Sequence, residues 1–256
     1  MGKLKQSFCW GGFVRGAMTG EEIIPAAAKM GYTGAEFVPQ EYWPLMKEHG
    51  LTLVSINGHQ SIQEGLNRRK NHARIESEIL AHLKLAEQWK IEKLIVFSGN
   101  RAGLDDAAGA EITAEGLRRV AKAAQDAGVT LIMELLNSKV NHKDYQNDHV
   151  AWGVEVCQRV DSPAVKLLYD IYHMQIMEGD IIRTIQNNHA YFAHYHTAGN
   201  PGRHEIDETQ ELYYPAIVRA ILATGYRDFL GQEFGPLGDT LTALQNAFTL
   251  CDISVP

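Results

Sequence analysis

The chain has 256 residues, of which 45% are hydrophobic and 21% charged, a composition that excludes a disordered protein. Its formal net charge of −7 disfavours nucleic acid as a partner, because duplex-binding surfaces normally carry a basic excess. No apolar run approaches the roughly 18 residues that span a bilayer, so we expect no integral membrane protein. The cysteines Cys9, Cys157 and Cys251 match no zinc or redox spacing, which favours a reducing, cytoplasmic location. No apolar segment follows the lysines of MGKLKQSFCW, so we predict no signal peptide.

Short apolar runs that begin directly after a glycine are the main structural signal along the chain. Gly31, Gly50, Gly128 and Gly225 each follow a helix-like stretch, at the point where a helix end favours positive φ. The runs are nearly continuous in Val, Ile, Leu and Phe, which is typical of parallel strands covered by helices on both faces. In chain order, the predicted strands are 7–10, 34–38, 51–57, 93–97, 129–134, 165–170, 191–196 and 229–233.

Helical patterns fill every gap between these strands, and a last helix is predicted over 239–251. Eight repeats in 256 residues give about 32 residues each, close to the roughly 30 of a βα unit. We therefore predict a single (β/α)8 TIM barrel, α/β in class, that forms one domain over residues 1–256. A doubly wound open sheet is the alternative, but Gly11 and Gly12 after the first strand do not form G-x-G-x-x-G.

Metal-capable side chains close the last four predicted strands of the barrel. Because active sites of TIM barrels lie at the carboxyl ends of the strands, we expect these four groups to converge on one point. Carboxylates with one imidazole suit Mn²⁺, Mg²⁺ or Co²⁺, with Zn²⁺ as a further option, and leave positions open for a substrate. The predicted ligands are Glu134, Asp170, His196 and Glu233.

Further candidates lie near the same strand ends. Arg203 stands in the long connection 197–209, where a guanidinium could bind a carboxylate or a diol, or could instead anchor the loop. His173 follows Asp170 by three residues, so its ring can reach what Asp170 faces. His59 and Glu36 lie on the same rim, and we interpret Glu36 as a group that supports the ligands. We expect the histidines without a convergent partner to lie at the surface: His72, His82, His142 and His149.

Several motifs resemble the xylose-isomerase-like TIM-barrel superfamily, and within it the hydroxypyruvate isomerase family. They are ELLN from Glu134, D-x-x-H from Asp170, H-T-A-G-N-P-G-R-H-E from His196 and Q-E-F-G-P around Glu233. The resemblance implies a divalent-metal isomerase that converts hydroxypyruvate to tartronate semialdehyde through an enediolate. It also implies that Glu134 and Glu233 act as metal ligands and acid/base pair, that Asp170 and His196 complete the metal shell, and that His173 and Arg203 contact the substrate. From their positions in the sequence, we add Lys139 and His59 as further candidates for substrate binding.

Two departures from the family pattern leave the substrate open. His196 stands where many hydroxypyruvate isomerases have Gln, as in the ketose 3-epimerases, and Lys139 takes the place of an arginine in LLNSKVNHKDY. The alternatives are a ketose 3-epimerase of the tagatose or psicose type, an inosose dehydratase, an enzyme similar to endonuclease IV, and a non-catalytic sugar-binding barrel. The expected partner is a small hydroxy-carbonyl or sugar molecule, without nucleic acid or membrane. Members of the family are often dimers or tetramers, which implies a homo-oligomer.

Overall fold

The computed structural model describes residues 3–254, so both ends of the predicted domain 1–256 lie outside the described residues. Its strands form a closed barrel in the order β1-β2-β3-β4-β5-β6-β7-β8, which confirms the predicted (β/α)8 fold. Each predicted strand overlaps an observed one, and the ends differ by at most two residues. The strands are β1 (Lys5–Cys9), β2 (Gly34–Glu36), β3 (Thr52–Asn57), β4 (Lys93–Val96), β5 (Thr130–Glu134), β6 (Val165–Asp170), β7 (Phe192–Thr197) and β8 (Phe229–Gln232).

Helices separate consecutive strands, as expected for repeated βα units. The α-helices are α1 (Trp10–Phe13), α2 (Gly20–Met30), α3 (Trp43–Glu48), α4 (Arg69–Trp89), α5 (Asp106–Asp126), α6 (Val150–Val160), α7 (Ile171–Met177), α8 (Ile181–Asn188), α9 (Tyr214–Ala223) and α10 (Thr240–Cys251). Two short 3-10 helices, η1 (Gln40–Tyr42) and η2 (His189–Tyr191), complete the described elements. The predicted glycine positions hold: Gly31 has φ +110° at the end of α2, and Gly128 has φ +68° after α5.

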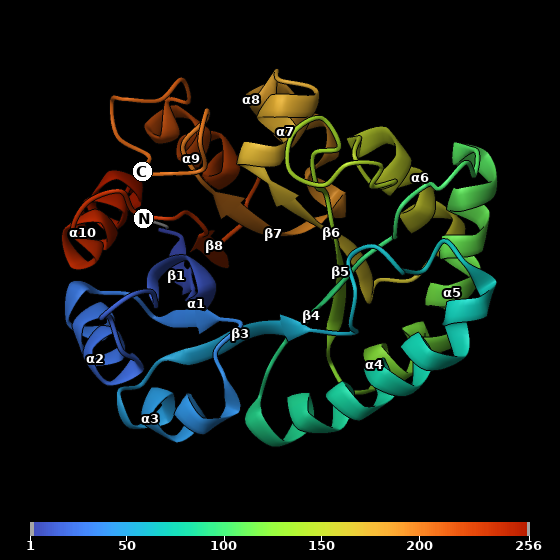
Figure 1. Cartoon of the computed structure of the whole chain (residues 1–256), viewed down its shortest axis with the longest axis horizontal. Helices are drawn as coiled ribbons and strands as arrows, with labels where there is room; N and C mark the ends of the chain where they lie inside the picture. Colours follow the sequence, from blue (N-terminus) through green and yellow to red (C-terminus); the bar gives the residue numbers. More distant parts are fainter. Residues whose placement is uncertain (1–2, 255–256) are drawn as a thin grey trace. The chain divides into compact units, whose positions relative to one another are not determined.

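The chain divides into two compact units. Unit 1 comprises residues 3–54, 180–189 and 194–254, and unit 2 comprises residues 55–179 and 190–193. In unit 2, the long helices α4 and α5 run side by side along β4 and β5 (Figure 1). The parallel register pairs Glu134 of β5 with Leu168 of β6, so these two strands end close to one another. Unit 2 therefore brings two of the predicted ligand-bearing strand ends together.

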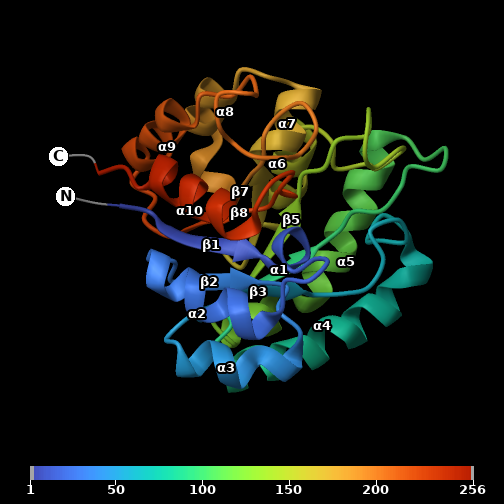
Figure 2. The same cartoon turned by 60° about the vertical axis from the view of Figure 1, so that its left-hand side comes forward.

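In unit 1, β1 pairs with both β2 and β8, and Cys9 lies opposite Glu36. Helix α10 packs against α2 and α9 beside these strands (Figure 2). The ring of Tyr32 contacts Phe248 of α10 at a centroid distance of 5.1 Å, and its hydroxyl donates to the carbonyl of Leu244. This packing holds β1 and β2, which carry the buried side chains of Cys9 and Glu36.

Three of the four histidines predicted at the surface are not exposed; His149 is exposed, whereas His82 is half-buried with its Nδ1 2.9 Å from the carbonyl oxygen of Gly58. His72 is buried, and its Nε2 lies 2.8 Å from the carbonyl oxygen of Leu66, so that prediction is wrong. Its position in α4 faces the core because a helix buries the stripe that also carries Ile75 and Ile79. His142 is half-buried, with its ring 5.2 Å from the ring of His173, and therefore does have a convergent partner. Among residues 3–254, no helix is both long enough and apolar enough to cross a bilayer.

Candidate functional site

Two buried carboxylates end neighbouring strands of unit 2. Glu134 is the last residue of β5, and Asp170 is the last residue of β6. Asp170 is also the N-cap of α7, where its Oδ1 accepts a hydrogen bond of 2.9 Å from the backbone N–H of His173. An oxygen of Glu134 and an oxygen of Asp170 lie within 4.8 Å of each other. Carboxylates buried this close repel one another unless a cation is present, which makes the pair suited to a divalent metal.

A buried amide sets the orientation of His173. Asn137 accepts hydrogen bonds at Oδ1 from the backbone N–H groups of Val140 and Asn141, so its Nδ2 is identified as the donor. That Nδ2 lies 2.5 Å from Nδ1 of His173, which must accept and therefore leaves the ring proton on Nε2. Nε2 in turn lies 3.8 Å from Oδ2 of Asp170. The geometry makes His173 a neutral donor next to the carboxylate pair.

The remaining predicted residues of unit 2 contact the backbone. The ammonium of Lys139 donates to the carbonyls of Ile176 and Met177 at 3.0 Å each, and so caps the carboxyl end of α7. His59 has Nδ1 2.9 Å from the carbonyl of Gln60, while Nε2 accepts from the N–H of Phe97 at 2.9 Å. Burial lowers the pKa of His59, which keeps the ring neutral. Both side chains therefore have contacts that stabilise the local structure.

In unit 1, one glutamate contacts two cationic groups. Oε2 of Glu233 lies 2.9 Å from Nδ1 of His196 and 2.8 Å from Nη2 of Arg203. Arg203 is held in the connection 197–209 with φ +60°, and its carbonyl accepts from the N–H of Gly235. The guanidinium therefore binds Glu233, and the predicted contact with a substrate carboxylate would have to compete with this ion pair.

The other nitrogen of His196 faces a second, fully buried carboxylate. Nε2 of His196 lies 3.1 Å from Oε2 of Glu36, and Nε2 of His194 lies 2.9 Å from the same oxygen. The hydroxyl of Ser7 donates to Oε1 of Glu36 at 2.6 Å. Burial alone would raise the pKa of Glu36, but the two histidines outweigh it and hold that pKa well below its usual value. Glu36 is therefore a buried anion that orients both rings, consistent with the supporting role predicted for it.

Protonation of His196 follows from its negative surroundings. Burial would lower its pKa, but the charges of Cys9, Glu233 and Glu36 raise it well above the usual value. Burial also raises the pKa of the Cys9 thiol, so the two carboxylates are the effective charges. The ring then donates from both nitrogens, with a proton between Nδ1 and Glu233. A divalent cation could replace that proton, because metal ligation requires a neutral imidazole.

A glycine leaves room for this arrangement. A Cβ atom at Gly231 would lie 2.4 Å from Oε1 of Glu36 and 2.8 Å from Cδ2 of His196. Distances below 3.0 Å require one of the groups to move, and both groups are held by other contacts. Close packing of Glu36 and His196 against position 231 therefore requires glycine there. The motif H-Y-H over 194–196 was the available sequence signal, since i and i+2 on a strand face the same side.

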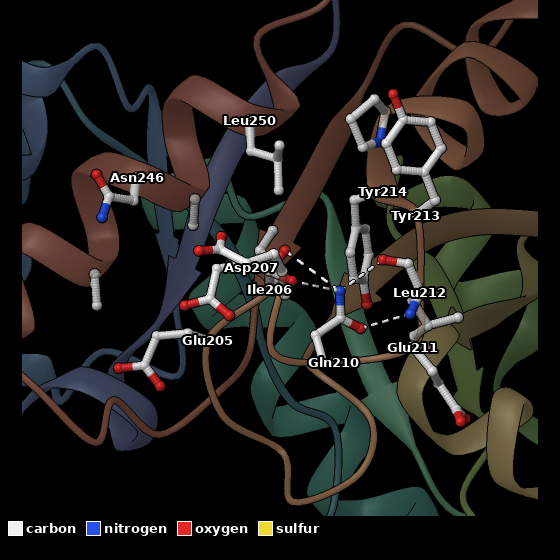
Figure 3. Close-up of a pocket in the computed structure, with 14 residues that line it drawn as sticks. Glu205, Ile206, Asp207, Gln210, Glu211, Leu212, Tyr213, Tyr214, Asn246 and Leu250 are labelled. Atoms are coloured by element: carbon white, nitrogen blue, oxygen red, sulfur yellow. Dashed lines mark hydrogen bonds between the residues drawn. The ribbon is translucent and has the colours of Figure 1, made fainter.

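Unit 1 also contains a pocket of about 460 Å³ between the connection 197–209, α9 and α10 (Figure 3). Its lining includes the apolar side chains of Ile206, Leu212 and Leu250 and the carboxylates of Asp207 and Glu211. The amide of Gln210, which Figure 3 shows inside the pocket, is bonded to backbone groups such as the N–H and carbonyl of Leu212. Glu205 and Glu208 add two further carboxylates to this lining.

Comparisons with known proteins show which family the chain resembles. A family model described as xylose isomerase-like TIM barrel matches residues 24–246. A Danio rerio protein provisionally named hydroxypyruvate isomerase is 32% identical over 129 residues, which span 50% of this chain and 47% of that protein. A 2-oxo-tetronate isomerase of Pectobacterium atrosepticum is 29% identical over 84% of this chain and 86% of its own. The crystal structure of an AP endonuclease, family 2, from Brucella melitensis has a TM-score of 0.84 at 28% identity, covering 95% of this chain and 97% of that one.

Proposed function

The chain belongs to the xylose isomerase-like TIM barrel family, and we propose that it is a divalent-metal-dependent isomerase of a small hydroxy-carbonyl acid. The proposed reaction converts hydroxypyruvate to tartronate semialdehyde. The relatives named hydroxypyruvate isomerase and 2-oxo-tetronate isomerase support this class of reaction. The observation that carries the proposal is the pairing of His196 and Arg203 with one oxygen of Glu233, because it provides a ligand and an ionised base in one place.

The proposed metal ligands are Glu134 and Asp170 of unit 2 with His196 and Glu233 of unit 1. Their donor set fits a divalent cation, because three carboxylates and one imidazole supply hard oxygens and a single nitrogen. We assign Nδ1 of His196 to the cation, since Nε2 donates to Glu36 and a carboxylate behind a ligating histidine is a common support. When bound, the cation would polarise the substrate carbonyl and stabilise the negative charge of the enediolate.

Two glutamates then move the protons. One carboxylate removes the proton from the carbon that carries the hydroxyl, and a second carboxyl group returns a proton to the neighbouring carbon. The hydroxyl proton passes to the former carbonyl oxygen, so that the alcohol and the carbonyl exchange places. We assign the first role to Glu233, because the guanidinium of Arg203 favours its ionised form. Glu134 takes the second role. The Nε2 proton of His173, fixed by Asn137, is available to hold a substrate oxygen.

Direct assay of the purified chain tests this function. The chain is reconstituted with Mn²⁺, Mg²⁺ or Co²⁺ and incubated with hydroxypyruvate and with a panel of ketoses, and the products are identified by NMR. We expect isomerisation of hydroxypyruvate that a chelator abolishes and the metal restores. Epimerised ketose as the only product would instead establish the 3-epimerase alternative, and cleavage of abasic DNA the endonuclease alternative.

Substitution of the proposed base tests the assignment of residues. Glu233→Gln preserves the shape of the side chain but removes the base, so we expect turnover to fall by at least about 100-fold. Glu208→Gln is the matched control, because Glu208 is exposed in the same unit and lines the separate pocket. Turnover of Glu233→Gln equal to that of the control would contradict the assignment.

A further inference from the structure

Arg15, which lies outside the motifs that resemble the family, is placed beside the strand end that carries Glu233. Arg15 follows β1 and α1, where its backbone N–H donates to the carbonyl of Phe13 at 3.1 Å. Its Nε donates to the carbonyl of Gly12 at 2.6 Å, which fixes the direction of the side chain. The carbonyl of Arg15 accepts from the N–H of Met18 at 3.0 Å. Arg15 is therefore an exposed residue whose backbone and Nε are both held by hydrogen bonds.

The guanidinium lies directly over Gly235. A Cβ atom on Gly235 would fall 1.7 Å from Nη2 and 2.8 Å from Nη1 of Arg15, so the guanidinium occupies the space of a side chain. The backbone of Gly235 is fixed on both sides, by its N–H to the carbonyl of Arg203 and by His204 to its own carbonyl. Gly235 follows Glu233 by two residues, so Arg15 lies at the carboxyl end of β8, where barrel active sites lie.

Aromatic packing fixes this end of β8 against α1. The rings of Phe13 and Phe234 meet edge to face at 4.9 Å, and both side chains are buried. A Cβ atom on Gly12 would lie 2.4 Å from the carbonyl oxygen of Phe234, so the two backbones are in direct contact. The position of Arg15 relative to β8 therefore follows from packed, buried groups on both sides.

The other predicted cations are already engaged. Arg203 forms its ion pair with Glu233, and Lys139 caps α7. Within residues 3–254, by contrast, Nη1 and Nη2 of Arg15 form no hydrogen bond or ion pair. Two N–H edges of a planar guanidinium match the two oxygens of a carboxylate. Arg15 is thus the cation near Glu233 that is available to an incoming anion.

We propose that Arg15 binds the carboxylate of the substrate and selects small 2-oxo or 2-hydroxy acids over neutral ketoses. The inference rests on the proposed isomerase function and names the substrate class of the same site. The hydroxy-carbonyl end of the substrate lies toward Glu233, while its carboxylate lies toward the guanidinium over Gly235. A neutral ketose has no group that uses the charge of Arg15.

Steady-state kinetics of Arg15→Leu test the proposal. We expect KM for hydroxypyruvate to rise about 10- to 100-fold, the range for loss of a charge-assisted hydrogen bond, with kcat changed far less. Arg15→Lys keeps the charge but loses the planar donor pair, so we expect its KM to lie between those of the wild type and Arg15→Leu. Arg219→Leu is the matched control, since Arg219 is an exposed arginine of α9 in the same unit. The affinity of the metal-loaded protein for tartronate, measured by calorimetry, is expected to fall with the same rank order.

The outcomes separate this inference from the proposed function. If the wild-type chain isomerises hydroxypyruvate but Arg15→Leu retains the KM and tartronate affinity of Arg219→Leu, the role of Arg15 is refuted. If the wild-type chain acts on neutral ketoses alone, the acid substrate class and the role of Arg15 are both refuted. A chain that isomerises neither substrate class refutes the proposed function itself. If Arg15→Leu has a larger KM for hydroxypyruvate but an unchanged KM for any ketose that the wild type converts, the role of Arg15 is supported.

Discussion

Replacing Glu36 with glutamine should weaken cation binding without touching a proposed ligand. Glu36 accepts from Ser7, His194 and His196, whereas an amide has one acceptor oxygen and an NH₂ that can only donate. If the amide oxygen takes the place of Oε1, which lies 2.6 Å from the hydroxyl of Ser7 and 3.0 Å from Nε2 of His194, the NH₂ takes the place of Oε2 and faces Nε2 of His196. That nitrogen must then accept, which moves the ring proton to Nδ1, the nitrogen that we assign to the cation.

The expected magnitude follows from the burial of this cluster. Glu36, His194 and His196 have no exposed surface, so loss of one charged partner leaves an uncompensated buried group. Breaking a buried ion pair typically costs about 3–5 kcal/mol of unfolding free energy. Loss of the group that supports a ligating histidine typically lowers metal affinity about 10- to 100-fold, which corresponds to about 1.4–2.7 kcal/mol.

Calorimetric titration with Mn²⁺ and urea unfolding of Glu36→Gln measure the two effects. Glu48→Gln is the matched control, because Glu48 is an exposed glutamate of the same unit at the end of α3. Nitrogen chemical shifts of the histidine rings report the tautomer of His196 directly. Wild-type affinity for Mn²⁺ together with an unchanged His196 tautomer would refute the reasoning.

The remaining predictions concern the steric space at position 231, the orientation of the His173 ring and the hydrogen-bonded carboxylate of Asp148. Gly231→Ala introduces a Cβ atom 2.4 Å from Oε1 of Glu36, so we expect a loss of about 1–3 kcal/mol in urea unfolding and weaker Mn²⁺ binding; unchanged values for both would contradict the tight fit. Asn137→Ala removes the donor to His173 and the acceptor of two backbone N–H groups, so kcat/KM should fall by about 10-fold or more, a result that unchanged kinetics would exclude. Burial would raise the pKa of Asp148, but hydrogen bonds from Arg101, Ser138 and His149 lower it below the usual value. A lowered carboxyl pKa stabilises the fold above the unfolded value of about 3.9, and this contribution is lost as pH falls through the folded pKa. The unfolding free energy of Asp148→Asn should therefore lie below that of the wild type at pH 7 and approach it in acid; a difference independent of pH would contradict the ion pair.

The barrel could be predicted from sequence because its signals are local. Glycine after each helix and an apolar run after each glycine locate the strands, and the residue at the end of each run locates Glu134 and Asp170. Two sequence signals indicate Asp170, because the D-x-x-H spacing also fits an N-cap whose carboxylate accepts a hydrogen bond from the backbone N–H of His173.

Contacts between segments distant in sequence could not be predicted in this way. The roles of Asn137 and Glu36 depend on which ring nitrogen each one faces, and that follows from packing rather than from spacing. Arg203 suits a substrate anion by its chemistry, yet the structure places it on Glu233. Arg15 has no motif around it, and only the approach of α1 to Gly235 shows its relation to the site.

The central claim is that Glu134, Asp170, His196 and Glu233 hold one divalent cation together. Calorimetric titration of the metal-free chain with Mn²⁺, repeated for Asp170→Asn and His196→Leu, tests it most directly. We predict one bound ion per chain in the wild type and a large loss of affinity in both variants, one from each unit. Absence of Mn²⁺ binding to the wild-type chain, or binding that either substitution leaves unchanged, would contradict it.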